Sequence, residues 1–420
     1  MDTTPVQRRR IPARTRVIAT CCVLAAAVTG TLAAGPAPAS SSRPDDRHDR
    51  HDQLQRAVER AREDAGFVGL SVEVRDGERR DWAGAGEAKL GTGKPVPRNG
   101  SLRAASATKS FTAVVVLQLV AEGKLSLDDP VEKWLPGVVS GNGNDGNRVT
   151  VRHLLQHTSG IYNYDFLEDT EHGGGKDGDT KKAFERTRFN RVTPEDGVTG
   201  AMRHKPDFPP AAPDDPEPDW NYSNPNFLLA GMLIEKITGH PWDREVRHRI
   251  THPLALRHTY APAPGDASLP EPHARTYQTY RDAKGWTDTT VRTVGHAGAA
   301  GSLISTERDL ERFYTALIRG RLLPPRQLAE MRRTVPVNES FQKIFPGMGY
   351  GLGLMRNNLS CGGRYVGHGG DLEGFYLWSG VTEDGHRSLV INATGKSHDP
   401  KKDFKARRAL NKLTDEVLCR

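Results

Sequence analysis

Residues 104–125 read AASATKSFTAVVVLQLVAEGKL, and this stretch decides how the chain is built around one serine. Its apolar side chains predict an amphipathic or buried helix. Ser106 and Lys109 stand on one face of its first turn, because side chains at positions i and i+3 are neighbours. A serine hydroxyl becomes a nucleophile when a base takes its proton, and a lysine in a dry cleft can be that base. The stretch is therefore either a capped helix start or a nucleophile with its base.

The serine–lysine spacing is not specific by itself. Ser340 and Lys343 repeat it in a short polar segment with no long apolar helix behind it, so we set that pair aside. On spacing alone, a helix cap is the simpler explanation for Ser106.

A second segment, WNYSNPNF, adds polar groups that suit catalysis. Tyr222 and Asn224 are two residues apart, and an extended backbone points both side chains the same way. Tyr222 can relay a proton if a neighbouring cation makes its phenol more acidic. The amide of Asn224 can hold a substrate carbonyl and the lysine. The alternative is a turn before a helix.

A third segment, YVGHGGDLEGFY, places His368, Gly369 and Gly370 at the end of a strand. Glycine lets another backbone come close, which suits a substrate laid along a sheet edge. His172 and His296 also stand beside glycines, but neither lies between two strand-like runs. A histidine in such a place is more often structural than catalytic.

The composition indicates a large globular protein without an electrostatic footprint for nucleic acid. The 420 residues, of which 36% are hydrophobic and 26% charged, suffice for one large domain or two lobes. Of the net charge of +7, +4 lies in residues 1–39, which hold five arginines and one acid, and +3 remains elsewhere. This charge balance excludes a strongly basic surface on the protein of the kind that binds nucleic acid.

The N-terminus has the pattern of a secretory signal peptide at residues 1–39: a basic segment, an apolar segment and the small residues APA before cleavage. LAAG is a competing cleavage site, and a retained membrane anchor is the alternative. Residues 40–51 are expected to be a disordered leader before a domain at residues 52–420. We therefore expect a secreted protein without a stable membrane anchor after cleavage. The two remaining cysteines, Cys361 and Cys419, suggest one disulfide, with two unpaired thiols as the alternative.

The order of strands and helices predicts the fold class. A helical pattern with Leu54 and Val58 precedes alternating strands at 68–74 and around Trp82, and strands return after residue 348 before a final helix. Pairing of the early hairpin with the late strands would give one antiparallel sheet covered by the terminal helices. The middle of the chain would form a mostly helical second lobe. We expect the site in the cleft between these lobes.

Taken together, the ordered motifs S-x-x-K, Y-x-N and H-x-G resemble the penicillin-recognising serine hydrolases. The similarity is to class C β-lactamases and, most of all, to secreted D-alanyl-D-alanine carboxypeptidases (peptidase family S12). LRAASATKSFTAVVVLQLVAEGKLSLDDPVEKWLPG, VTVRHLLQHTSGIYNYD, NYSNPNFLLAGMLIEKITGH and GSLISTERDLERFYTAL also look like this family. The resemblance spans almost all of the chain after the leader. It implies a β-lactamase/transpeptidase-like α/β fold and a disulfide between Cys361 and Cys419.

The resemblance also implies a mechanism through an acyl-enzyme on Ser106. Lys109 and Tyr222 would move its proton to the leaving amine and later activate water. Asn224 would hold the substrate amide, and His368 would set the electrostatics around Tyr222. The oxyanion would lie between the backbone N–H groups of Ser106 and Asp371, beside Gly369 and Gly370.

Two departures concern the substrate. Where the carboxypeptidases carry HTGT, this chain has residues 368–371, HGGD, so both hydroxyls that hold a substrate carboxylate are absent. Their arginine before the cysteine corresponds to Met355, and Arg356 would face the other way on a strand. A carboxylate at Asp371 should repel an anionic substrate terminus.

These features support several hypotheses. The first is a D-alanyl-D-alanine carboxypeptidase acting on cell-wall peptides, which would also bind β-lactams. The second is an esterase or D-aminopeptidase of the same family, with Asp371 pairing with a substrate ammonium group. A β-lactamase or an inactive binding protein is less favoured. No cofactor or metal is expected, because the fifteen histidines lack ligand spacing. Peptides or β-lactams are the expected partners, and the sequence does not predict an oligomeric state.

Overall fold

The computed structural model of the chain describes residues 44–163, 179–212 and 215–420. The predicted signal peptide at 1–39 and His172 lie outside these ranges. Residues Asp45–Arg420 form one unit.

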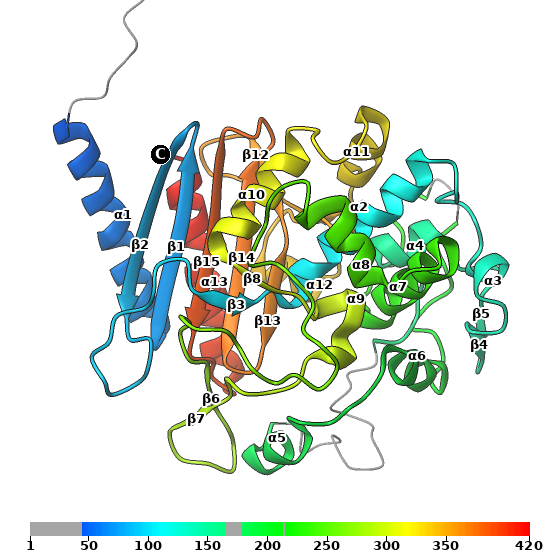
Figure 1. The fold of residues 1–420 in the computed structure, drawn as a ribbon, viewed down its shortest axis with the longest axis horizontal. Helices are drawn as coiled ribbons and strands as arrows, with labels where there is room; N and C mark the ends of the chain where they lie inside the picture. The colour runs from blue at the N-terminus through cyan, green and yellow to red at the C-terminus, as the bar shows by residue number, and fades with distance from the viewer. Residues whose placement is uncertain (1–43, 164–178, 213–214) are drawn as a thin grey trace, which may run out of the picture. The chain divides into compact units, whose positions relative to one another are not determined.

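Nine strands of the described residues form one sheet, in the order β2-β1-β15-β14-β12-β11-β10-β9, with β13 paired to β14 (Figure 1). All neighbours are antiparallel, and β1 pairs with β15, so that Val72 lies opposite Ile391. This confirms the predicted pairing of the early hairpin with the late strands. The strands are β1 (Gly69–Asp76), β2 (Arg79–Gly86), β9 (Val335–Pro336), β10 (Gly349–Tyr350), β11 (Met355–Asn358), β12 (Arg364–Gly367), β13 (Gly369–Leu372), β14 (Phe375–Thr382) and β15 (Arg387–Thr394).

Helices cover both faces of this sheet. The terminal helices α1 (Pro44–Ala65) and α13 (Pro400–Leu418) bury Leu54 and Leu413 in one cluster with Ile391. Helix α10 (Glu307–Ile318) buries Phe313 in a second cluster with Val390. Successive residues of a strand point to opposite faces, which is why Val390 and Ile391 serve different layers.

Helix α1 begins earlier than the sequence predicted. Residues 44–51, expected to belong to a disordered leader, are helical. The packed residues Leu54 and Val58 supply the costly helix nucleus, and each further turn then adds hydrogen bonds without new nucleation. The polar composition of residues 44–51 therefore led to a predicted helix start that was too late.

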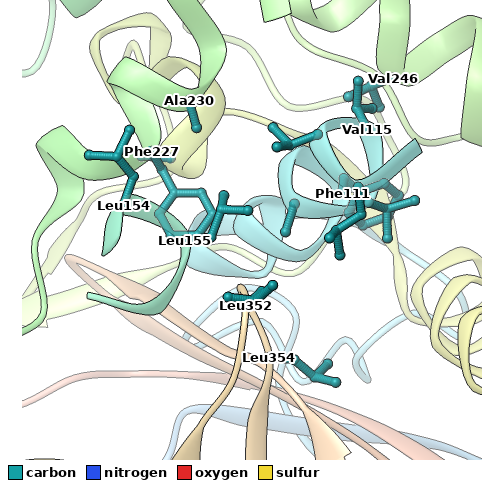
Figure 2. Close-up of a cluster of buried hydrophobic side chains, with 14 of the residues drawn as sticks. Phe111, Val115, Leu154, Leu155, Phe227, Ala230, Val246, Leu352 and Leu354 are labelled. Carbon is teal, nitrogen blue, oxygen red and sulfur yellow. The ribbon is translucent and has the colours of Figure 1, made fainter. Parts of the chain in front are cut away.

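The second lobe is built around α2 (Thr108–Ala121), whose residues Phe111, Val115 and Leu117 are fully buried. In Figure 2, Phe227 and Leu155 lie against this helix from one side. A helix that is apolar all round belongs in a core, as its sequence predicted. The other helices are α3 (Val131–Trp134), α4 (Val151–Gln156), α5 (Lys181–Thr187), α6 (Pro194–Met202), α7 (Asn224–Thr238), α8 (Trp242–Val246), α9 (Gly298–Gly301), α11 (Pro325–Arg332) and α12 (Glu339–Ile344).

Short elements complete the fold. Residues Arg247–Thr251 form a π-helical turn, and Ala105–Ala107 and Gly295–Ala297 form 3-10 turns. In the described part of the chain, three two-stranded ladders join β3 (Ser101–Arg103) to β8 (Ile304–Thr306), β4 (Ser140–Gly141) to β5 (Asn144–Asp145), and β6 (Tyr277–Thr279) to β7 (Trp286–Asp288).

Cys361 and Cys419 are joined by a disulfide, which ties the end of α13 to the β11–β12 turn. None of the helices in the described ranges is long and apolar enough to cross a membrane.

Glu307, the first residue of α10, is buried beneath the first hairpin. Its carboxyl group bonds to the hydroxyl of Ser71 and to Trp82 Nε1, the latter at 3.3 Å. Burial raises the pKa of Glu307 to about 8, and the neighbouring Glu73 adds to the shift, while the two hydrogen bonds oppose it. No cation of the described residues bonds to this carboxyl group.

Candidate active site

Ser106 stands on the 3-10 turn directly before α2, rather than inside the α-helix. The residue before it, Ala105, has φ +44°, in the left-handed region that residues with a Cβ seldom adopt. Such a conformation costs on the order of 1–3 kcal/mol and persists only where the surrounding structure enforces it. The turn places Ser106 in the walls of two neighbouring cavities.

Lys109 is fully buried behind the serine. Its Nζ lies 3.2 Å from Ser106 Oγ, 2.8 Å from Asn224 Oδ1 and 2.8 Å from the carbonyl oxygen of Ala300. Burial lowers the pKa of Lys109 well below its usual value, and the negative charge of Asp371 opposes this only in part. A neutral amine can donate to Asn224 and Ala300 and turn its lone pair to Ser106, as a general base requires.

Tyr222 precedes α7, and its ring centre lies 4.8 Å from Lys109 Nζ. The hydroxyl is buried and has no hydrogen-bond partner of good geometry among the described residues. Burial raises the pKa of Tyr222, although the nearby Ser106 side chain lowers it. The expected acidification by a neighbouring cation is therefore absent, because Lys109 is itself pushed towards its neutral form. In this state, Tyr222 is a neutral phenol that can pass a proton on.

Asn224 begins α7 and fixes the lysine through its side-chain oxygen. Its backbone N–H donates to Asn163 Oδ1 at 2.8 Å. Tyr222 and Asn224 both line the larger cavity beside Ser106, as their spacing predicted.

Strand β13 brings the third motif against the nucleophile. A Cβ at Gly370 would lie 2.6 Å from the carbonyl oxygen of Ala104 and 3.2 Å from the backbone nitrogen of Ser106. Glycine is therefore needed for this close approach. A Cβ at Gly369 would meet the ring of Trp378 at 2.6 Å. The strand edge thus runs beside the Ser106 backbone, where an oxyanion would form.

His368 is buried and bonds at both ring nitrogens. Nδ1 lies 2.6 Å from the carbonyl oxygen of Gly369, and Nε2 lies 2.9 Å from the hydroxyl of Tyr350. A carbonyl only accepts, so Nδ1 carries the proton and Nε2 accepts from Tyr350. Burial is the main cause that lowers the pKa of His368 to about 3, and a positive charge on Lys109 would act in the same direction. It affects Tyr222 as a neutral dipole, not as a cation.

Asp371 is paired, which changes its predicted effect on substrates. Lys396 Nζ and Arg407 Nη2 both donate to its Oδ2, the latter at 2.9 Å. Burial would raise the pKa of Asp371, but the attraction of Arg407 and Lys396 and their hydrogen bonds lower it. The carboxylate is therefore charged but largely neutralised, so its expected repulsion of an anionic substrate is offset by two cations.

Ser106 lies between two cavities of different character. One, of about 400 Å³, is mostly apolar, and the other, of about 810 Å³, is polar. Asp371 lines both. The apolar cavity is walled by Phe341, Ile344, Phe345, Met355, Trp378 and Leu410. The polar cavity holds Asp179, Arg292, Glu373, Lys396, Asp403 and Arg407.

The structure also places residues that the sequence set aside or missed. Ser340, discarded as a nucleophile, lines the apolar cavity, while Lys343 pairs with Glu339 at 2.9 Å. His296 lines the polar cavity. Met355 lines the apolar cavity and Arg356 does not, as strand alternation predicted. The signal that would have found Ser340 and His296 is tertiary, because nothing local marks either residue.

His157 is the buried group that sequence reasoning overlooked. It follows α4 with φ 64°, and its Nδ1 lies 3.2 Å from both the backbone nitrogen of Ser223 and Asn226 Nδ2. Its ring lies 4.4 Å from that of Tyr222. These contacts hold the segment that carries Tyr222. The segment HTSG, already noted in the family resemblance, was the available signal.

No group of three or more metal-binding side chains occurs among the residues that the structure describes. The site described above consists of side chains and backbone groups.

Comparison with known proteins gives the same family. The Beta-lactamase family profile matches residues 54–413. The chain is similar to a D-stereospecific amidohydrolase from Streptomyces sp. (44% identity, TM-score 0.73, 85% of this chain and 98% of that one). It is also similar to the D-amino acid amidase from Ochrobactrum anthropi SV3 (26% identity, TM-score 0.71, 88% and 97%).

Among curated proteins, penicillin-binding protein 4* of Bacillus subtilis is 24% identical over 89% of this chain and 77% of its own length. The family match, the antiparallel sheet with its helical lobe, and the juxtaposition of Ser106 with Lys109 agree. The chain is a serine hydrolase that belongs to the β-lactamase family.

Proposed function

We propose that this chain hydrolyses amides and peptides of D-amino acids that carry a free α-amino group. The observation that carries the proposal is the position of Ser106, with its buried base Lys109, between an apolar and a weakly anionic cavity. This is the alternative that the sequence left open beside the carboxypeptidase.

The apolar cavity suits the substrate side chain. Its volume of about 400 Å³ and its walls of Phe341, Met355 and Trp378 fit an aromatic or large aliphatic group. Burial of such a group yields about 25 cal/mol per Å² of apolar surface, which favours bulky substrates over alanine.

The polar cavity suits an ammonium group. Among the described residues that line it, four carboxylates, those of Asp179, Asp371, Glu373 and Asp403, stand against three cations, Arg292, Lys396 and Arg407. The excess of one negative charge favours a substrate cation over an anion.

The geometry leads to a two-step reaction. Lys109 takes the proton of Ser106 as Oγ attacks the substrate carbonyl, and the backbone N–H groups of Ser106 and Asp371 stabilise the oxyanion. As the C–N bond breaks, Lys109 and Tyr222 pass that proton to the leaving amine. Water then attacks the acyl ester, loses a proton by the same route, and frees Ser106.

The similar proteins support this substrate class. One is named a D-stereospecific amidohydrolase, and another is a D-amino acid amidase with a structure complexed with D-phenylalanine. D-Phenylalanine amide is therefore our first test substrate.

The experiment compares four substrates: D-phenylalanine amide, its L-enantiomer, its N-acetyl derivative and an N-acylated D-alanyl-D-alanine peptide. We expect the highest kcat/KM with D-phenylalanine amide, and loss of at least about 10³-fold in Ser106→Ala. Equal rates with the N-acetyl derivative would contradict recognition of the ammonium group. Equal rates with both enantiomers would contradict the proposed stereochemistry.

A D-alanyl-D-alanine carboxypeptidase is the second candidate. Lys396 and Arg407, which meet beside Ser106, are cations that can bind a terminal carboxylate. The similarity to penicillin-binding protein 4* supports this candidate too. Intact mass after incubation with benzylpenicillin tests it: a penicilloyl adduct mapped to Ser106 favours it, and its absence disfavours it.

We also propose that the protein is secreted. The support is the basic-then-apolar pattern of residues 1–39 and the pairing of Cys361 with Cys419, since disulfides persist in oxidising compartments. N-terminal sequencing of the protein from culture medium tests this. A chain beginning near Ser40 is expected, and retention in the cells with an intact Met1 would contradict it.

A further inference from the structure

Two cations converge on one oxygen atom in the wall of the cleft. Lys396 follows β15, Arg407 lies on α13, and both donate to Oδ2 of Asp371. A carboxylate has two oxygens and about four acceptor positions, and no bond from a described residue reaches Oδ1. Both contacts are thus concentrated on the single oxygen Oδ2.

Other groups hold the two cations in place independently of Asp371. The ring of Tyr376 lies beside both of them, 5.3 Å from Lys396 Nζ and 5.2 Å from Arg407 Cζ. Arg407 Nε also donates to Asp403 Oδ2 at 2.8 Å. The hydroxyl of Tyr376 donates to the other oxygen of Asp403. If the charge of Asp371 were removed, Arg407 would stay anchored by Asp403, and Lys396 would stay against the ring.

This position is open to a ligand beside the nucleophile. Asp371 is 35% exposed in its side chain and lines both cavities together with Ser106. It also faces Tyr376 across the β13–β14 pair, which keeps its carboxylate over the two cations. A carboxylate of a substrate bound at Ser106 can reach the same place.

We infer that Lys396 and Arg407 form an anion-binding subsite that the carboxylate of Asp371 fills. Asp371 thereby excludes substrates with a free carboxylate next to the leaving group and selects amides and esters there. It is a specificity-determining residue, and the subsite beneath it takes carboxylates when it is vacant. This inference rests on the proposed function, because it concerns the leaving-group side of the same reaction.

A matched pair of substrates tests the inference: D-phenylalanyl-D-alanine and its C-terminal amide, which differ only at the terminal carboxylate. The quantity measured is the ratio of kcat/KM for the free acid to that for the amide. In the unmodified protein we expect a ratio below about 0.1. Asp371→Asn should raise the ratio at least about tenfold, mainly through a lower KM for the free acid.

Asp403→Asn is the matched control, because Asp403 lines the same cavities and also bonds to Arg407, but does not contact Lys396. It removes the same charge from the cavity but leaves the carboxylate of Asp371 on the two cations. We expect it to change the ratio by less than about threefold. An equal rise in both variants would mean that only the net charge of the cavity matters, and would overturn the inference.

Two further measurements separate the remaining outcomes. Adding Lys396→Met to Asp371→Asn should abolish the gain, and a gain that survives contradicts the subsite. If Asp371→Asn hydrolyses neither dipeptide, calorimetry with acetate decides: binding to the folded variant but not to the unmodified protein supports the subsite, and no binding overturns it. If the unmodified protein leaves the amide dipeptide intact, the proposed function fails, whatever acetate shows.

Discussion

Asp371, which is partly exposed, and Glu307, which is buried, are two carboxyl groups whose pKa values shift in opposite directions. The pKa of Asp371 is lowered, since burial, which would raise it, is outweighed by Arg407 and Lys396. The pKa of Glu307 is raised to about 8, because burial acts there with only a hydroxyl and an indole N–H in opposition. One group is charged at neutral pH and the other holds its proton. Burial therefore sets the charge of a group only where no opposite charge has been placed beside it.

The largest predicted effect extends this comparison to Lys109, a buried lysine that has no carboxylate partner among the described residues. Lys109 bonds to neutral oxygens, and burial lowers its pKa, so its working form is the amine. Lys109→Arg keeps a charge that cannot be lost, and kcat/KM for D-phenylalanine amide should fall about 10³-fold. For the unmodified protein, kcat/KM should rise with pH as Lys109 loses its proton.

The control for this change is a lysine that has a carboxylate partner away from the site. Lys133 Nζ lies 2.7 Å from Asp129 on the exposed surface. Lys133→Arg should leave kcat/KM within about twofold. Full activity of Lys109→Arg would contradict a neutral amine as the base.

The next effect concerns the free energy of unfolding, which should depend on pH through the ionisation of Glu307. Its pKa is about 8 in the folded protein against 4.5 as a free group, so its stabilising contribution is complete below pH 4.5 and is lost as the pH rises to 8. Glu307→Gln cannot ionise and should escape this loss, which amounts to about 1.4 kcal/mol per pH unit over that window. Urea unfolding at pH 5 and pH 8 measures it. Equal pH dependence in both proteins would show that Glu307 ionises normally.

The third prediction concerns Asp371, for which the pH dependence of stability is opposite to that of Glu307. The folded-state pKa of Asp371 is lowered, so its stabilising contribution is present above the unfolded pKa of 3.8 and is lost as the pH falls through the folded value. Asp371→Asn should lower the free energy of unfolding by about 1 kcal/mol at pH 7, a small figure because the side chain is partly exposed. The difference should vanish at strongly acidic pH. A variant less stable by the same amount at every pH would point to packing.

A further effect, of similar size, tests the hydrogen bond that opposes the rise in the pKa of Glu307. Trp82 Nε1 donates to its carboxyl group and favours the charged form. Trp82→Phe removes the donor, and we expect a loss of about 0.5–1.5 kcal/mol in the free energy of unfolding. The loss should grow with pH, because the pKa of Glu307 rises further without the bond. A loss that shrinks as the pH rises would contradict that bond's effect on Glu307.

Much of the fold was predictable, because its signals are local. Alternation in the strands and apolar spacing in α2 and α13 recur within a few residues. The motifs around Ser106, Tyr222 and His368, in this order along the chain, indicate the family and therefore its fold. The start of α1 was missed, because a polar sequence continues a helix once packed residues have nucleated it.

The charge pattern of the site could not be predicted in the same way. Lys396 and Arg407 lie in unrelated segments, and only the tertiary fold sets them on Asp371. The protonation states of Lys109, Tyr222 and His368 follow from burial, which a local sequence does not report. The sequence therefore predicted which of these side chains the fold brings together, but not their charges.

The pairing of β1 with β15 has a consequence for the order of synthesis. Gly69 and Thr394 are in contact although 325 positions separate them along the chain. A ribosome must therefore finish nearly the whole domain before the central strand of the sheet can be inserted. Until then the hairpin of β1 and β2 presents an open edge, of the kind that pairs with other chains. The sheet of this protein is therefore completed only after β15, the last strand in the chain, has been made.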